Sequence, residues 1–268
     1  MASVFSPKRP EWFRGAVVAA AAALLVYFVW AWWTPWRPGR AGGLTFGTIA
    51  ALLFFYDGLY PLRARLLAWP FRTAQQWLQL HIYGGVIAML CVLIHAGFAW
   101  PTGTMGWWLL GLSVWTTFTG VLGTMLQKWI PTVIAGSLRV EALTARMPEL
   151  TARLLTEADG VMRGASDRLW AAYQSDIRPR LERPEPAWAH VANAQSGRSR
   201  YAGPLAALDR VADADRANEL RAIVTEKAEL DVHLSLQRAL RAWLFLHVPP
   251  AVALLGLLAV HIFAVLYL

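Results

Sequence analysis

Long apolar segments separated by short polar turns dominate the pattern of this chain. Each segment is long enough, at about 1.5 Å per residue, to cross the hydrocarbon core of a bilayer as a helix. Tryptophans lie at the ends of most segments, as is typical of the boundary between membrane and water. The pattern predicts five transmembrane helices, over about residues 15–33, 44–62, 77–100, 106–128 and 242–268.

The segment between the fourth and fifth apolar runs has a different pattern. Ala, Leu, Arg and Glu recur at helical spacing over residues 148–182 and 205–240, with a stretch containing proline and glycine between them. This pattern is typical of amphipathic helices in water. The predicted fold class is therefore an all-α membrane protein. Residues 1–130 hold transmembrane helices one to four, residues 131–240 form a cytoplasmic helical hairpin, and residues 241–268 form the fifth transmembrane helix.

Composition agrees with a membrane protein, since 57% of the residues are hydrophobic and 16% are charged. The net charge of +8 arises outside the hairpin, because residues 131–240 contain fifteen basic and fifteen acidic residues. The other ten basic residues lie near the ends of apolar segments, where they set orientation rather than bind nucleic acid.

Orientation follows from these basic residues. The N-terminus and the connection that contains Arg63 and Arg72 are predicted to be cytoplasmic, which leaves the C-terminus outside a bacterial-type cytoplasmic (inner) membrane. Arg37 and Arg40, in the first outer turn, are exceptions to this rule.

Four histidines lie inside two of the predicted transmembrane helices. His81 and His95 are fourteen residues apart, and so are His247 and His261. Fourteen residues advance an α-helix by about 21 Å and return to within about 40° of the same face, so each helix presents two imidazoles on one side. The two helices run in the same direction in the predicted topology, which places His81 level with His247 and His95 level with His261. Ionisable side chains at such depths need a partner or a ligand.

Two stacked pairs of imidazoles match what two six-coordinate haem irons require, namely one axial nitrogen from each side. The chain has no CxxCH motif for covalent attachment, so the haems would be b-type. The predicted ligands are His81 and His247 for one haem, and His95 and His261 for the other. Alternatively, the histidines hydrogen-bond between helices or relay protons, and the chain is a haem-free transporter, a proton-conducting subunit or an assembly anchor.

Further residues are candidates for holding the haem groups. Gly84 and Gly85 would give a flat macrocycle room beside the backbone, or serve helix packing alone. Arginines at the helix ends would pair with haem propionates or anchor in lipid head groups. They are Arg63 and Arg72 on the cytoplasmic side, and Arg37 and Arg40 on the outer side.

The paired histidine spacing on the third and fifth spans resembles the cytochrome b superfamily of bis-haem membrane proteins, in particular its ferric-reductase-like transmembrane group. The resemblance covers about residues 44–128 and 242–268 and implies that the four histidines are haem ligands. The chain departs from that group because it carries the helical insert and lacks a sixth span and a flavin and NADPH domain. We therefore expect its electron donor to be a separate molecule.

The predicted function is that of a membrane di-haem b-type cytochrome, an electron-transfer subunit of a membrane oxidoreductase complex, which carries electrons across the bilayer between a quinone pool and a redox partner. Expected partners are other subunits of the complex, a quinone or a soluble electron carrier, and the lipid bilayer. No catalytic residue is predicted. Asp57 would relay protons to a quinone, or pair with Arg63 or Arg65.

Overall fold

The protein divides into two compact units. A computed structural model describes residues 10–62, 73–134, 140–183, 203 and 214–267, and these residues contain helices and turns but no strand. One unit comprises residues 1–128 and 243–268, which we call the apolar unit, and the other comprises residues 129–242, which we call the insert unit. The predicted boundaries, after residues 130 and 240, lie two residues from these limits.

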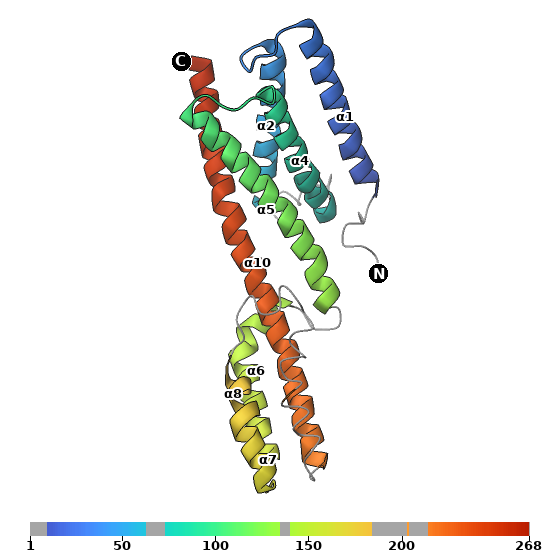
Figure 1. The fold of residues 1–268 in the computed structure, drawn as a ribbon, viewed down its shortest axis with the longest axis vertical. Helices are drawn as coiled ribbons and strands as arrows, with labels where there is room; N and C mark the ends of the chain where they lie inside the picture. The colour runs from blue at the N-terminus through green and yellow to red at the C-terminus, as the bar shows by residue number, and fades with distance from the viewer. Residues whose placement is uncertain (1–9, 63–72, 135–139, 184–202, 204–213, 268) are drawn as a thin grey trace. The chain divides into compact units, whose positions relative to one another are not determined.

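Five helices are long and apolar enough to cross a membrane. They are α1 (Pro10–Trp33), α2 (Ala41–Gly58), α4 (Ala74–His95), α5 (Thr104–Ile134) and α10 (Ala214–Tyr267) (Figure 1). A short 3-10 helix, η1 (Tyr60–Leu62), follows α2, and α5 and α10 contribute residues to both units. The predicted all-α class and the five apolar helices are confirmed, and the chain is compatible with a multi-pass membrane protein.

The helix that carries His81 and His95 has well-defined ends. At its start Thr73 and Gln76 form a capping box, in which the Thr73 hydroxyl accepts from the Gln76 backbone N–H at 3.3 Å and the Gln76 side chain accepts from the Thr73 N–H at 2.9 Å. At its end Gly97 adopts a left-handed φ of 65°. A Cβ there would lie 2.7 Å from Cδ1 of Trp36, so this turn needs glycine. The turn makes His95 the last residue of α4.

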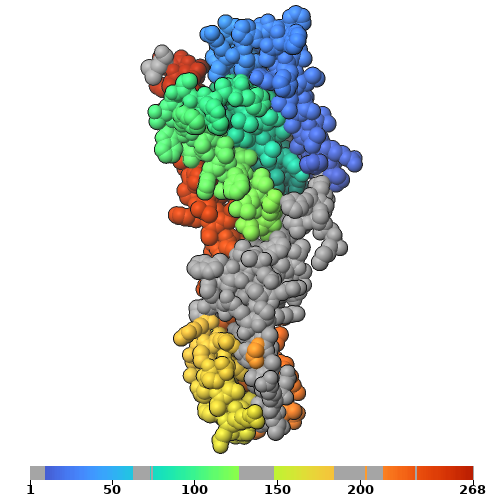
Figure 2. Space-filling model, viewed as in Figure 1, coloured from blue at the N-terminus to red at the C-terminus, as the bar shows by residue number. Residues whose placement is uncertain are grey.

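Small and aromatic side chains fill the apolar unit between α2 and α4. Two clusters of buried residues lie there, and α5 and α10 join the second of them through Leu109, Leu112, Leu255 and Leu258. Gly58 lets α10 approach, because a Cβ on it would lie 2.6 Å from Cδ1 of Leu255. On the visible face α1, α4 and α5, coloured blue to green, form one continuous surface (Figure 2). The buried members of the clusters are Phe46, Ala50, Cys91 and Ile94, and Phe54, Ala88 and Leu254.

The insert unit contains α6 (Val140–Val161), α7 (Asp167–Ala172), a π-helical turn η2 (Tyr173–Ile177), α8 (Arg178–Glu182) and the first part of α10. The prediction of one amphipathic helix over residues 148–182 is wrong in one respect. The helix is interrupted between the end of α6 at Val161 and the start of α7 at Asp167. Gly164 takes a left-handed φ of 75°, and Ser166 then caps α7 by accepting from the Leu169 N–H. A glycine turn followed by a serine cap ends one helix and starts the next.

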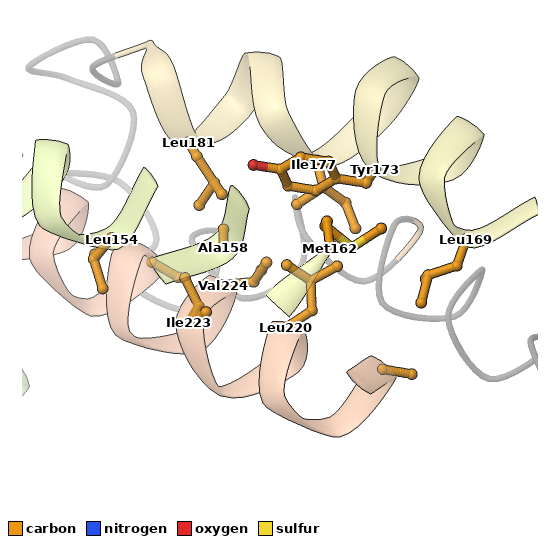
Figure 3. Packing of buried hydrophobic residues seen from close by; sticks show 12 residues of the cluster. Leu154, Ala158, Met162, Leu169, Tyr173, Ile177, Leu181, Leu220, Ile223 and Val224 are labelled. Atoms are coloured by element: carbon orange, nitrogen blue, oxygen red, sulfur yellow. The ribbon is translucent and has the colours of Figure 1, made fainter. Parts of the chain in front are cut away.

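An apolar core holds the insert unit together. Figure 3 shows Leu154, Met162, Leu220 and Val224 among the side chains that meet between α6, α7, α8 and α10. Tyr173 lies in this core, and its hydroxyl donates to Asp159 Oδ1 at 2.6 Å. Burial and the Asp159 carboxylate both raise the pKa of Tyr173, so this hydroxyl stays protonated and keeps donating.

Candidate metal centres

The imidazoles of His81 on α4 and His247 on α10 lie next to each other in the apolar unit, in a T-shaped arrangement. Their ring centroids are 6.3 Å apart and their planes are 88° apart. Two imidazoles that bind one metal ion from opposite sides have centroids about 6.2–6.5 Å apart, because each metal–nitrogen bond is about 2.0–2.1 Å long and each ring centre lies about 1.1 Å beyond its nitrogen. The separation of these two rings therefore fits one iron between them.

Aromatic rings hold this pair from both sides. Tyr60 stacks on His81, with centroids 4.6 Å apart and planes 20° apart. Trp243 stacks on His247, with centroids 5.7 Å apart and the same interplanar angle of 20°. Both imidazoles are thus held against a flat neighbour, which restricts how far each ring can turn.

Thr119 on α5 hydrogen-bonds to His247. Its hydroxyl oxygen lies 2.8 Å from the carbonyl oxygen of Trp115 and 2.9 Å from Nδ1 of His247. When the hydroxyl donates its single proton to the Trp115 carbonyl, it accepts from the imidazole N–H at Nδ1. In this tautomer Nε2 of His247 keeps the lone pair that a metal needs.

Further polar contacts join α5 to α10 beside His247. Pro250 has no N–H to bond the Leu246 carbonyl four residues earlier, and that carbonyl accepts instead from Nε1 of Trp115 at 2.9 Å. Nε1 of Trp243 donates to the Thr119 carbonyl at 2.6 Å. Gly123 makes room for this indole, since any Cβ there would collide with the Trp243 ring. α10 continues as one helix through Pro249 and Pro250.

Asp57 on α2 faces the other imidazole of this pair. Its Oδ1 lies 3.6 Å from Nδ1 of His81, and the side chains of Asp57 and His81 are 10% and 26% exposed. That separation is an ion-pair distance rather than a hydrogen bond. A Cβ at Gly84 would lie 3.3 Å from Asp57 Oδ1 and one at Gly85 3.2 Å from Oδ2, so both glycines leave room for this carboxylate. Their clearance of a haem stays a prediction.

His95, in the second pair, hydrogen-bonds to the backbone of α2. Its Nδ1 lies 2.8 Å from the carbonyl oxygen of Gly43. Because a carbonyl only accepts, Nδ1 of the neutral ring carries the proton and Nε2 is left for a metal. Gly47 makes the approach possible, since a Cβ there would lie 2.7 Å from Nδ1 of His95.

His95 and His261 line one cavity of about 420 Å³ in the apolar unit. This volume lies within the range of about 300–1,000 Å³ that is typical of ligand and cofactor pockets. Apart from the two histidines, the lining contains no ionisable side chain, and Thr48 and Ser113 supply its hydroxyl groups. The other lining residues are Leu44, Gly47, Ala50, Ala51, Leu52, Phe54, Phe55, Val92, Leu109, Leu254, Leu258, Ile262, Val265 and Leu266.

His261 differs from the other three histidines. It lines the same cavity as His95, from α10. In the part of the chain that the structure describes, its ring has neither a hydrogen bond nor a stacked aromatic neighbour. The structure thus brings the four predicted ligands together as two pairs. His81, His95 and His247 each have a hydrogen bond or a stacked ring, whereas His261 has neither among the described residues.

The structure describes two of the four arginines that were predicted to pair with haem propionates. Arg37 and Arg40 are exposed in the turn between α1 and α2. This turn lies against Gly43, whose carbonyl binds His95, because a Cβ on Gly43 would lie 2.5 Å from the Arg37 carbonyl oxygen. Arg63 and Arg72 lie outside the described residues.

Sequence reasoning missed the residues that position the imidazoles. Thr119, Trp115 and Gly43 were not among the predicted site residues, although hydroxyls and glycines recur along α5 in the run TTFTGVLGT. Such residues in an apolar helix are a signal of close helix contact and of interhelical hydrogen bonds.

Each histidine pair offers two imidazole nitrogens. Among the described residues, no three His, Cys, Asp or Glu side chains gather as ligands for one ion. A haem iron needs only two protein nitrogens, because the porphyrin supplies four. Comparison of the chain with protein-family models, curated proteins and solved structures finds no match.

Proposed function

We propose that this chain binds two b-type haems and carries electrons across a membrane, as a subunit of a larger redox complex. One haem lies between His81 and His247, and the other between His95 and His261. The 6.3 Å separation of the first two rings carries the proposal, since it is the separation that one shared iron requires.

The tautomers of the imidazoles support this assignment. Nδ1 of His247 and Nδ1 of His95 both face oxygen atoms, at 2.9 Å and 2.8 Å. Ligating histidines usually donate their second ring N–H in this way, which orients the ring and makes the ligating nitrogen more basic. In a proton relay, by contrast, both nitrogens must exchange protons with neighbours.

Each bound haem supplies a one-electron couple between ferric and ferrous iron. The chain sets the spacing of the two, since fourteen residues along α4 separate its ligands by about 21 Å. The lining of the His95/His261 site is almost entirely apolar. Arg37 and Arg40, and Arg63 and Arg72, are the proposed partners of the haem propionates.

The proposed partners are a quinone pool and a redox protein, with the N-terminus and the insert unit in the cytoplasm and the C-terminus outside. This orientation rests on the positions of the basic residues. The insert unit, which has an apolar core and a charged exterior, is then the part that meets cytoplasmic subunits.

Visible spectroscopy tests the cofactor. The full chain, purified in detergent, is expected to show a reduced-minus-oxidised spectrum of b-type haem with two haems per chain. A protein without a Soret band would defeat the proposal.

Electron transfer is tested in liposomes loaded with ferricyanide, with dithionite added outside. We expect protein-dependent reduction of the enclosed ferricyanide, and its loss in both His81→Ala and His95→Ala, because each variant lacks one of the two haems. A haem-loaded protein that reduces no ferricyanide would show that the haems serve another purpose.

A proton-conducting subunit is the second candidate, and the contact between Asp57 and His81 favours it. Proton flux through haem-free protein in liposomes, lost in Asp57→Asn, would support this function instead.

A further inference from the structure

We propose that His261 is an exchangeable ligand, and that the His95/His261 site therefore binds a small neutral diatomic molecule such as carbon monoxide when its iron is ferrous. This inference rests on the proposed haem function. The two proposed haem sites have the same ligand type and the same spacing along the sequence, and we expect them to differ in how easily one ligand exchanges.

Three of the four imidazoles are held by neighbours. His247 has the Thr119 hydroxyl and the Trp243 ring, and His95 has the Gly43 carbonyl. The Tyr60 ring stacks on His81, whose Nδ1 lies 3.6 Å from Asp57 Oδ1 without a hydrogen bond between them. Hydrogen-bonded partners fix the orientation of a ligating imidazole, and their loss typically lowers metal affinity by about 10–100-fold, whereas a stacked ring restricts how far the imidazole can turn.

His261 has no such partner among the described residues. Its Nδ1 is not tied to a carbonyl or hydroxyl there, and no aromatic ring stacks on it. The ring is also only partly buried, on the α10 side of the cavity. Turning away from the iron would therefore break no hydrogen bond and no ring contact among the described residues, so its bond to iron would open more often than the other three.

The cavity suits a neutral diatomic molecule. No Asp, Glu, Lys or Arg lines it, and its walls are mainly aliphatic and aromatic. An anion would have to lose its hydration on entering such a site, whereas carbon monoxide has little hydration to lose. The exchange breaks one iron–nitrogen bond and forms one iron–carbon bond. No electron moves, and His261 leaves as a neutral imidazole.

The test is the carbon monoxide difference spectrum of the dithionite-reduced, haem-loaded full chain. We expect carbon monoxide to bind one of the two haems. In His81→Ala, which is expected to lack the other haem, the amount of carbon monoxide bound per chain stays the same. Binding that disappears together with the His81/His247 haem would overturn the inference.

Thr119→Val provides the matched control. It removes the hydroxyl that holds His247 while keeping the side-chain shape, so the His81/His247 haem should begin to bind carbon monoxide as well. Thr119→Ser should behave as the unmodified protein. All measurements are repeated in lipid nanodiscs, since binding seen in detergent alone would mean that the site had been damaged. A protein with two haems that binds no carbon monoxide contradicts this inference only, whereas a protein with no haem contradicts the proposed function as well.

Discussion

The two histidine pairs of this protein share a spacing of fourteen residues but have different surroundings. The His81/His247 pair lies between stacked Tyr60 and Trp243 rings and next to the polar groups of Asp57 and Thr119. The His95/His261 pair opens onto an apolar cavity, and only His95 is hydrogen-bonded in the described part of the chain. Histidines at an identical spacing can thus have different surroundings, and the neighbours of each ring decide how firmly it is held.

Replacing single histidines should have the largest effect on the haem content of the two sites. His81→Ala and His247→Ala should each remove the same haem and leave one haem per chain, because a b-type haem with a missing axial ligand is held weakly. His95→Ala should remove the other haem. Haem content and redox titration measure the outcome. The double variant His81→Ala/His247→Ala should lose no more haem than either single variant, and loss of different haems would show that the pairing is wrong.

Two glycine substitutions test the close approaches at the two sites. Gly47→Ala places a Cβ 2.7 Å from Nδ1 of His95, whereas Gly120→Ala places one 3.4 Å from Cε1 of His247, which is an ordinary contact. Overpacking of the first kind costs about 1–3 kcal/mol. We therefore expect Gly47→Ala to lower the occupancy of the His95/His261 haem and Gly120→Ala to leave both haems in place, as measured by haem content after gel filtration. Equal losses in both variants would contradict this account.

The hydroxyl of Thr119 gives a smaller effect. Thr119→Val should weaken haem binding at the His81/His247 site by about 10–100-fold and shift the midpoint potential of that haem alone, because His247 loses its acceptor. Haem transfer to apomyoglobin and a redox titration report the two changes. Thr119→Ser, which keeps the hydroxyl, is expected to restore both values, and a shift in both haems would point to a general loss of packing.

The contact between Trp115 and Leu246 should give the smallest effect. Trp115→Phe removes the indole N–H that binds the carbonyl freed by Pro250. A hydrogen bond between helices in a membrane is worth about 0.6–2 kcal/mol, so the melting temperature in detergent should fall slightly while the haem content stays at two per chain. Adding Pro250→Ala should recover part of the loss, because the new backbone N–H can bond Leu246 within the helix. Failure of this recovery would mean that the indole acts through packing alone.

The five apolar helices and the two histidines on each of α4 and α10 could be predicted from the amino-acid sequence alone. Both are local properties: apolarity and length favour a membrane-spanning helix, and fourteen residues are nearly four turns of any α-helix. The break at Gly164 was not predicted, although Gly164 and Ser166 are typical signals for the end and start of helices.

The groups that hold each imidazole became clear from the packing of the helices. The partners of His95 and His247 lie 52 and 128 residues away along the chain, and no periodicity relates such positions. The role of each glycine also depends on packing. Gly84 and Gly85 were predicted to make room for a haem, whereas the structure shows that Gly47 makes room for His95 and Gly123 for Trp243. A local pattern can place a ligand on a helix face, but its neighbours depend on how helices distant in sequence pack together.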